Sequence, residues 1–433
     1  MCRKRYGHRL DPGERWRRSL LVTNAGTRWE CKATLVAVSL ALALVAVYYR
    51  VEWKSVSGFV SAIDHCDTLF CDFVRHFHTM GRIVLSSARP VGGYLYSAFF
   101  SLLLVPFGSA PLPAATWFWG ALQIVLGVLL CIVPLKDLLR LSWRGTTLYV
   151  FLFVTSLPLL HNFKWGQVSV LVTLCIIASF HAYRRDRRVL AGFLLALGTS
   201  IKYYPGIFIL YYVFRRDLRV LSSFLVALLI LFFVSPALVM GPYQWLTFHR
   251  ESFAAIPDSS LIAQNPNSQY FAHVALRFMS SGATGTAAVV LKLLGYAVAC
   301  ANLALLWLIQ KSSVRDKEAL SAVTLFLALP FILQTSWPHY FVFLPFCQAV
   351  LLKQLHSFRH SHGFQSILLS AATVVSCALS SVFVFNRFDH WITYSRYGML
   401  LCASLLLQIT LYRLVASVQR LDMSKSLPIG NAA

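Results

Sequence analysis

The sequence is dominated by long apolar runs that recur from Thr34 to Val415 with only short polar or basic stretches between them. A helix of about 20 apolar residues is long enough to cross a bilayer, and many of these runs approach or reach that length. Of the 433 residues, 58% are hydrophobic and only 13% are charged. A soluble chain of this length would divide into domains with separate cores. We therefore expect an all-α polytopic membrane protein with one integral domain.

The basic residues predict how the chain is oriented. The formal net charge is +23, but Lys and Arg occur in short clusters between the apolar runs rather than on one amphipathic face. Cytoplasmic loops of membrane proteins have this enrichment, so the charge does not indicate a nucleic-acid partner. Residues 1–32 have no continuous apolar core, which predicts a basic cytoplasmic tail rather than a cleavable signal peptide. We also expect this tail to contact anionic lipid headgroups.

Combining the basic clusters with the apolar runs predicts twelve crossings with both ends in the cytoplasm. The integral domain covers residues 33–416, with a first outer loop at 52–115, a long outer loop at 241–285 and a cytoplasmic tail at 417–433. The alternation requires that the short apolar stretch 94–107 does not cross, so we predict an interfacial helix there. The predicted spans are about 33–51, 116–135, 146–160, 168–183, 189–201, 206–214, 219–240, 286–310, 319–333, 338–353, 364–385 and 396–416.

This topology collects the unusual polar residues on the outer face. Asp64, Asp67 and Asp72 fall within nine positions, although the whole chain has only 16 acidic residues. The other polar or aromatic residues expected there are Asn162, Lys164, Gln167, Lys202, Tyr203, Tyr204, residues 264–269, Ser336, Trp337 and His339. An outward-facing polar cavity accounts for the grouping. Simpler interpretations stay open, including solvated loop carboxylates, an interfacial lysine at Lys202 and aromatic-belt residues at Trp337 and the tyrosines.

The cysteines add one expectation. Most of the ten lie within apolar runs, where Cys behaves as a small hydrophobic residue. Cys66 and Cys71 share the first outer loop, so a disulfide between them is possible there. No paired set of Cys or His accompanies them at the spacing of zinc ligands.

One block of the sequence is similar to a known family. Its elements are Asn162-Phe163-Lys164-Trp165-Gly166-Gln167-Val168-Ser169, Arg184-Arg185, Leu190-Ala191-Gly192 and Ser200-Ile201-Lys202-Tyr203-Tyr204-Pro205. Their order and spacing resemble the signature of glycosyltransferase family 87. That family comprises polyprenyl-phosphate-mannose-dependent mannosyltransferases with the GT-C membrane fold, and the resemblance extends more weakly over residues 60–350.

Shorter motifs of the family also have similar counterparts here. Asp72-Phe73 resembles an Asp-Phe motif of its first outer loop, and Tyr94-Leu95-Tyr96 resembles its Tyr-x-Tyr-Pro-Pro helix start. Asn267-Ser268 with Arg277 resembles an Asn-Gln-Ser segment that leads to an Arg, and Ser336-Trp337-Pro338-His339 resembles a Ser-Trp-x-His motif. The chain departs from the family pattern at His76, Phe77, Ser97, Ala98 and Ser169. These departures concern the sugar and the acceptor more than the reaction class.

The resemblance implies a GT-C-type fold and transfer of a hexose, mannose by resemblance alone, from a polyprenyl-phosphate donor to a glycolipid or glycan acceptor. An acceptor hydroxyl needs a base as it attacks, and the resemblance gives that role to Asp72. Lys202 and His339, with Arg277 as a weaker third, are candidates to bind the donor phosphate. One carboxylate base with direct attack predicts inversion at the anomeric carbon. The remaining candidate substrate contacts are Asp64, Asp67, Tyr96, Asn162, Gln167, Tyr203, Asn267 and Trp337.

Three alternatives stay open. Asp64 or Asp67 could be the base or hold a divalent cation, but no Asp-x-Asp pair is present and cationic side chains are available, which favours a reaction without metal or cofactor. A transporter or flippase of lipid-linked sugars is the main rival from another class. It predicts internal repeats and ionisable residues at mid-membrane depth, and neither is evident in the sequence. The third alternative is a non-catalytic scaffold or a degenerate family member.

Overall fold

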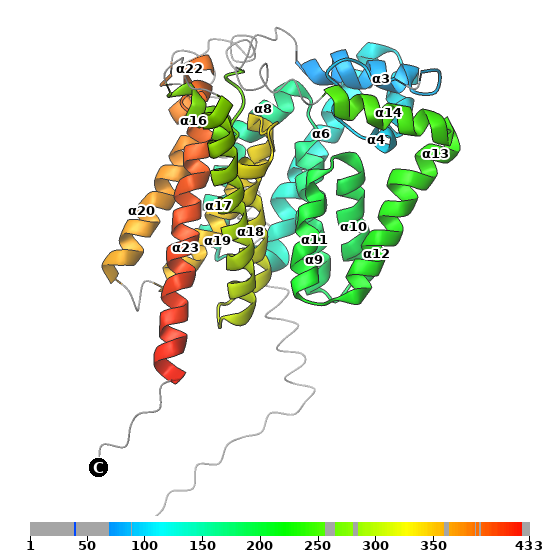
Figure 1. Ribbon diagram of the computed structural model, residues 1–433. Helices are drawn as coiled ribbons and strands as arrows, with labels where there is room; N and C mark the ends of the chain where they lie inside the picture. Colours follow the sequence, from blue (N-terminus) through cyan, green and yellow to red (C-terminus); the bar gives the residue numbers. More distant parts are fainter. Residues whose placement is uncertain are drawn as a thin grey trace, which may run out of the picture.

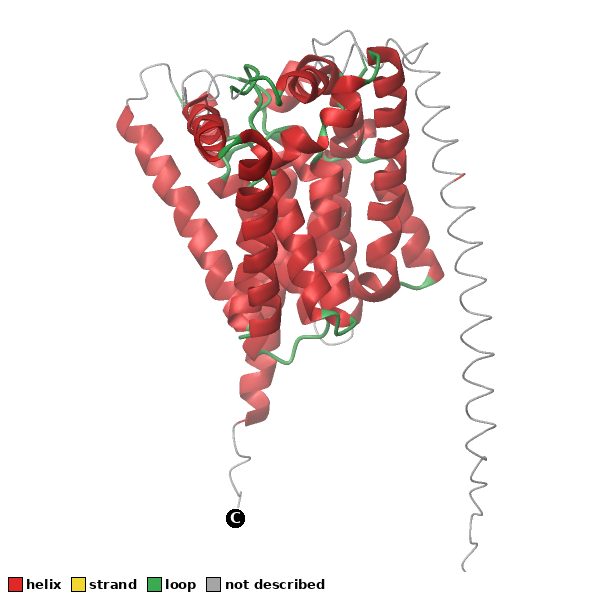
Figure 2. Ribbon diagram, turned by 90° about the vertical axis from the view of Figure 1, so that its right-hand side faces the viewer, coloured by secondary structure: helices red, strands yellow, loops and turns green. Residues whose placement is uncertain are grey.

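The part of the chain that the structure describes is built almost entirely of helices joined by turns and short loops. The computed structural model describes residues 39, 69–87, 89–255, 265–279, 285–358, 363–385, 387–388 and 391–426. An isolated antiparallel bridge between Ser156 and Ser381 is the single extended pairing among these residues. Long helices lie side by side in a bundle, and short helices gather across one end of it (Figures 1 and 2).

The helices have bounds that agree closely with the apolar runs of the sequence. In chain order they are η1 (Phe73–Phe77), α3 (His78–Ile83), α4 (Ala98–Leu103), α5 (Val105–Ser109), α6 (Leu112–Pro134), η2 (Leu135–Leu139), α7 (Trp143–Val154), α8 (Leu157–Trp165), α9 (Ser169–Arg184), α10 (Arg188–Ile201), η3 (Tyr204–Phe208), α11 (Ile209–Phe214), α12 (Leu218–Leu228), η4 (Leu229–Val234), α13 (Ser235–Met240), α14 (Pro242–Ala255), α16 (Phe271–Arg277), α17 (Gly285–Lys311), α18 (Lys317–Ile332), η5 (Pro338–Phe343), α19 (Leu344–Phe358), α20 (Gly363–Leu379), α21 (Val382–Phe385), α22 (Trp391–Arg396) and α23 (Met399–Ser426).

Among the residues that the structure describes, five helical segments are long and apolar enough to cross a membrane. They are Leu112–Leu139, Leu218–Met240, Gly285–Lys311, Pro338–Phe358 and Trp391–Arg420. Shorter apolar helices at Ser169–Arg184, Arg188–Ile201, Tyr204–Phe214 and Phe364–Leu379 run between them. This is the architecture of a polytopic membrane protein. The count of twelve crossings stays a prediction, because its first span and the basic tail fall almost entirely outside the described residues.

The stretch that was expected not to cross forms two very short helices. α4 has six residues and α5 has five, so at 1.5 Å per residue neither approaches the thickness of a bilayer. Both lie with α3 and α14 across the same end of the bundle (Figure 1). The described part of the segment 241–285, which was predicted as a long outer loop, contains the helices α14 and α16.

One predicted span is interrupted. The apolar run 146–160 divides into α7 and α8 at Thr155 and Ser156. The backbone groups at this break are not left unsatisfied, because the Leu157 N–H donates to the Ser380 carbonyl at 2.9 Å and the Val382 N–H donates to the Thr155 carbonyl at 3.0 Å. A break in a membrane helix is tolerated when neighbouring protein satisfies the freed groups, and here the residues around Ser381 do so.

Burial distinguishes the centre of the bundle from its lipid-facing edge. Every residue of α18 from Ala319 to Phe331 is buried, as expected for a helix that is apolar on all sides and surrounded by others. By contrast, only 17% of the most apolar part of Leu218–Met240 is buried, so most of its side chains are available to lipid.

Aspartates tie the basic loops together at one end. Asp316 pairs with Arg184 at 3.3 Å and with Lys353 at 2.6 Å, which joins the ends of α9, α18 and α19. Asp137 pairs with Arg185 at 2.6 Å. These loops belong to different predicted cytoplasmic clusters, and the structure brings them to the same end of the bundle.

Candidate active site

Four candidate residues from four separate segments meet at the end of the bundle that carries α3, α4 and α8 (Figure 1). The Gln167 side-chain amide donates a hydrogen bond to Asp72 and accepts one from the Tyr96 hydroxyl. The Lys202 ammonium in turn donates to the Tyr96 hydroxyl at 3.4 Å. A continuous chain of side chains, which we call the Lys202–Asp72 chain, therefore connects a cation to a carboxylate.

The segment that supplies Gln167 is fixed by its backbone. α8 ends at Gly166 with φ of +66°, a left-handed conformation that favours glycine. The Trp119 indole donates to the Gly166 carbonyl at 2.9 Å, and the Gln167 N–H donates to the Asn162 carbonyl at 2.9 Å. The turn after α8 is thus held on both sides, and it directs the Gln167 side chain toward Asp72.

Asn162 supports this turn rather than reaching Asp72. Its side-chain amide donates to the Gln123 side chain at 3.0 Å, and Gln123 donates to the Gln167 carbonyl at 3.0 Å. All three side chains are buried. The network joins α6 and α8 beneath the Lys202–Asp72 chain and restricts the position of Gln167.

The two ends of the Lys202–Asp72 chain, the ammonium and the carboxylate, differ in their environment. Lys202 is only 5% exposed and lies against the rings of Tyr340, at 3.9 Å, and Tyr96, at 4.8 Å. Burial lowers the pKa of Lys202 to about 7, and the nearby Asp72 carboxylate acts in the opposite direction. The Asp72 side chain is 21% exposed and lies 3.9 Å from the His76 imidazole. A reactant can therefore reach the carboxylate, while the lysine is shielded from water.

A stack of aromatic rings adjoins the lysine. His339 stacks on His161 with 5.6 Å between ring centroids, and His161 stacks on Trp391 at 5.0 Å. Both histidines are buried. Within the described part of the chain, neither ring nitrogen of His161 has a hydrogen-bond partner, and neither does Nδ1 of His339. Buried donors and acceptors are usually satisfied, so unpartnered imidazoles beside a buried lysine point to a ligand.

Arg277 has a different environment from the other candidate cations. Its guanidinium donates to the carbonyls of Pro266, at 3.0 Å, Ser395, at 3.2 Å, and Asn265, at 2.8 Å, and also to that of Ser268. These bonds join the segment before α16 to α22. Asn267 in the same segment accepts a hydrogen bond from the Trp391 indole, so this loop reaches the histidine stack through Trp391.

Two further candidates have contacts that do not include the Lys202–Asp72 chain. The Tyr203 hydroxyl lies 3.5 Å from Nδ1 of His249, and its ring packs on Phe253 of α14. Trp337, which directly precedes η5, is partly buried and packs against the apolar core. Asp64 and Asp67 lie outside the described residues, so the structure provides no test of either as base.

A disulfide lies next to Asp72 in the sequence. Cys71 is disulfide-bonded, and the six cysteines that are free in the described residues do not include its partner. The expected partner, Cys66, lies outside the described residues. Because Cys71 directly precedes Asp72, the bond limits the freedom of the backbone next to the carboxylate.

Sequence reasoning missed three residues of this site. Gln123 and Tyr340 lie within apolar runs and match none of the motifs considered, so no pattern distinguished them. His161 begins the polar stretch that is predicted to lie on the outer face. Its place there is the sequence feature that could have identified it as a site residue. No group of three or more His, Cys, Asp or Glu residues that could hold a metal ion occurs among the described residues. The expected absence of a divalent cation stays a prediction.

The fold and this cluster define a polytopic membrane protein with a carboxylate and a buried lysine joined at one end of the bundle. The family model for glycosyltransferase family 87 matches residues 94–332, which is more than half of the chain. The chain belongs to glycosyltransferase family 87 and is a membrane glycosyltransferase. Neither the curated proteins nor the solved structures contain a match to it. The matched range includes Tyr96, Gln167 and Lys202 but excludes Asp72 and His339.

Proposed function

We propose that this glycosyltransferase moves a hexose, with mannose as the first choice, from a polyprenyl-phosphate donor to a glycolipid or glycan acceptor. The reaction takes place at the end of the bundle that carries the Lys202–Asp72 chain, on the extracytoplasmic face of the cell membrane. The observation that carries the proposal is the hydrogen-bonded connection between Lys202 and Asp72, because glycosyl transfer from a lipid phosphate needs a base and a cation within one site.

Asp72 acts on the acceptor. As an acceptor oxygen attacks the anomeric carbon, its proton passes to the Asp72 carboxylate, which the Gln167 amide holds in a fixed orientation. The partial exposure of this side chain supports the role, since the acceptor has to reach it.

Lys202 acts on the leaving group. When the bond between the anomeric carbon and the phosphate oxygen breaks, negative charge builds on the polyprenyl phosphate. A preorganised ammonium in a water-poor site stabilises that charge more than it would in bulk solvent. His339 lies near Lys202 and stacks on His161, and their unpartnered ring nitrogens are the proposed hydrogen-bonding groups for the same phosphate or for the sugar.

The proposed reaction inverts the anomeric carbon. A double displacement would need a second carboxylate as the nucleophile on the sugar. Within the part of the chain that the structure describes, Asp72 is the one carboxylate that hydrogen-bonds within the Lys202–Asp72 chain. Arg277 binds loop carbonyls, and we assign it the role of positioning that loop rather than gripping phosphate.

The test is sugar transfer from a radiolabelled polyprenyl-phosphate-mannose donor to membrane acceptors, measured for the wild type and Asp72→Asn at equal expression. Removal of the general base should lower transfer by roughly a hundredfold or more. Glu251→Gln is the matched control, because Glu251 is a carboxylate on α14 that pairs with the exposed Arg89. Its transfer should equal that of the wild type.

The other outcomes separate the alternatives. Equal transfer by wild type and Asp72→Asn would remove Asp72 as the base and leave Asp64 and Asp67 as candidates. Translocation of the lipid-linked sugar without any new glycosidic bond would replace the enzyme with a flippase. Transfer from a different polyprenyl-phosphate hexose, with none from the mannose donor, would keep the reaction and change the sugar.

A further inference from the structure

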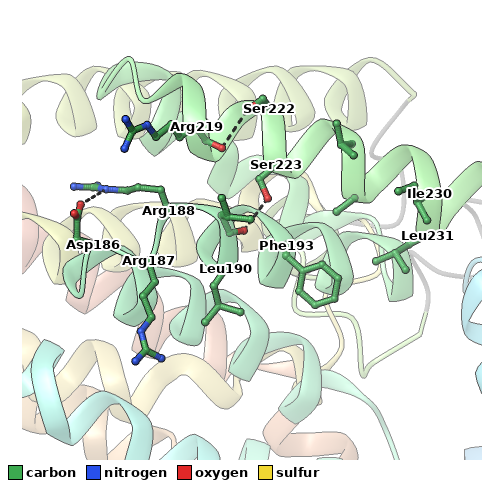
Figure 3. A pocket seen from close by; sticks show the side chains of 13 residues that line it. Asp186, Arg187, Arg188, Leu190, Phe193, Arg219, Ser222, Ser223, Ile230 and Leu231 are labelled. Atoms are coloured by element: carbon green, nitrogen blue, oxygen red, sulfur yellow. Dashed lines mark hydrogen bonds and ion pairs between the residues drawn. The ribbon is translucent and has the colours of Figure 1, made fainter.

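A groove lies between α10 and α12 on the side of the molecule that faces lipid (Figure 3). Its volume is about 980 Å³. Most of its wall is apolar and exposed, including Val189, Phe193, Val226 and Ile230. One end is strongly polar, because three arginines and one aspartate, Arg187, Arg188, Arg219 and Asp186, line it there.

The two walls are held in a fixed relation. A Cβ on Gly192 would lie 2.5 Å from the Val220 carbonyl oxygen, so α10 and α12 approach as closely as they do only because residue 192 is glycine. The Ser223 hydroxyl also donates to the Val189 carbonyl at 2.7 Å. The groove is therefore a built feature of this helix pair.

The arginines at the polar end are not equivalent. Arg188 is neutralised, since it contacts Asp186 at 2.8 Å and Asp217 at 3.2 Å. Arg187 and Arg219 are exposed, and within the described part of the chain no carboxylate pairs with either. In Figure 3 the Arg219 and Arg188 side chains extend toward the same end of the groove, and Phe193 and Ile230 lie further along it. The polar end thus carries uncompensated positive charge.

The length of the groove matches one leaflet. Leu231 lies twelve positions after Arg219, which corresponds to a rise of about 18 Å along the helix. Half of a bilayer's hydrocarbon core is about 15 Å thick. A molecule with an anionic head at Arg219 and an apolar chain directed toward Leu231 would therefore span one leaflet.

We propose that this groove binds one membrane phospholipid with an anionic headgroup, with the phosphate at Arg219 and an acyl chain along Phe193 and Ile230. The site is separate from the Lys202–Asp72 chain, because Arg188 is the first residue of α10 and Lys202 directly follows its other end. The bound lipid therefore belongs to the leaflet opposite the one in which sugar transfer is proposed.

The test uses the full chain in nanodiscs of equal parts phosphatidylglycerol and phosphatidylcholine, with retained lipids counted by native mass spectrometry. The wild type should retain phosphatidylglycerol in preference to phosphatidylcholine. An arginine near an anionic headgroup contributes about 1 kcal/mol, so Arg219→Gln should reduce the population that carries this one lipid about fivefold.

Arg216→Gln is the matched control. Arg216 is an exposed arginine in the turn just before α12 and does not line the groove, so this variant removes the same charge and should retain the lipid. Equal retention of both lipids by the wild type would overturn the proposal. So would equal losses in Arg216→Gln and Arg219→Gln, because the preference would then come from general surface charge.

Discussion

At the scale of single residues, Gln167 determines the arrangement of the Lys202–Asp72 chain. Its amide nitrogen has to face Asp72 and its amide oxygen has to face Tyr96, because a carboxylate only accepts and the Tyr96 hydroxyl donates. A carboxylate in place of this amide would face the Asp72 carboxylate directly. The residue type at position 167 is therefore set by chemistry and not only by packing.

The protonation of Lys202 should control donor binding. Its pKa is lowered to about 7 by burial, so the ammonium is present below that pH and is lost as the pH rises through it. Because the cation binds the donor phosphate in our proposal, kcat/KM should fall as the pH rises above about 7. Lys202→Arg should remove this decline, since a guanidinium stays protonated throughout.

The measurement is the pH profile of kcat/KM for sugar transfer by the wild type and Lys202→Arg. Lys202→Met, which has no charge, should lose transfer at every pH and serves as the control. If Lys202→Arg kept the same decline, another group such as His76 would be responsible. The pKa of His76 is also lowered by burial.

His161 should affect transfer without supporting the fold. His161→Phe keeps a ring against Trp391 but removes two buried ring nitrogens that lack partners in the described chain. Loss of a donor to developing charge should lower kcat about a hundredfold. The melting temperature should stay the same or rise, because an unsatisfied buried polar group is removed.

His249→Phe is the comparison for this substitution. His249 is also buried and packs on Phe232 and Trp245, away from the Lys202–Asp72 chain. It should leave kcat close to that of the wild type. A fall in melting temperature for His161→Phe with unchanged kcat would make His161 a packing residue only.

The sequence predicted Tyr96, Gln167 and Lys202 as one site, because each belongs to a motif. It did not predict the order of contacts between them. That order depends on the turn at Gly166 and on Gln123, which lies 44 positions before Gln167. Contacts at such a separation leave no local pattern, so His161 and Tyr340 were not identified as part of the site.

At the scale of helices, the end of α8 is the element that presents Gln167. A Cβ at Gly166 would lie 3.0 Å from the Phe73 Cβ and 3.1 Å from the Phe70 Cβ, in addition to the cost of a left-handed backbone. Gly166→Ala should therefore destabilise the protein by about 1–2 kcal/mol and lower transfer by displacing Gln167. Thermal unfolding in detergent and the transfer assay measure the two effects.

A second glycine provides the control for this substitution. Gly127 lies within α6, and a Cβ there would meet nothing within 4 Å. Gly127→Ala should be neutral or stabilising by about 0.5–1 kcal/mol, because alanine favours a helix interior. Equal stability and transfer for both alanine variants would show that the turn does not position Gln167.

Hydropathy identified the helices but not their interruptions. The predicted span 146–160 was drawn from its hydropathy, which does not register the break at Thr155. The local signal is Pro158, which follows Ser156 and lies in the first turn of α8. The break is stabilised by backbone partners at Ser380 and Val382, more than 200 positions away. A helix that local propensity favours can be interrupted where a distant segment provides hydrogen-bond partners for the backbone groups at the break. A single sequence does not show which distant segment does this.

At the scale of the whole molecule, the two ends of the bundle carry different sets of charged and polar residues. One end contains basic loops joined through Asp137 and Asp316, and the other contains the Lys202–Asp72 chain. α23 runs from the second end to the first (Figure 1). The charge pattern predicted this separation, because each basic cluster was assigned to the same side from its sequence alone. Which end faces the cytoplasm is set by the membrane and needs a separate measurement.

We expect the basic end to be cytoplasmic, because cytoplasmic loops are enriched in Lys and Arg. Single cysteines at two exposed positions test this orientation. Arg89, before α4, has 78% of its side chain exposed, and Asp186, between α9 and α10, has 84%. In intact cells a membrane-impermeant maleimide should label Arg89→Cys, and it should label Asp186→Cys only after permeabilisation.

The background for both variants is Cys300→Ser, which removes an exposed native thiol and leaves the disulfide of Cys71 in place. The labelling of this background is subtracted. The reverse pattern would put the Lys202–Asp72 chain in the cytoplasm and the lipid groove in the outer leaflet. Because transfer to an extracytoplasmic acceptor requires the first orientation, the same labelling experiment decides whether the proposed donor and acceptor can meet at Asp72.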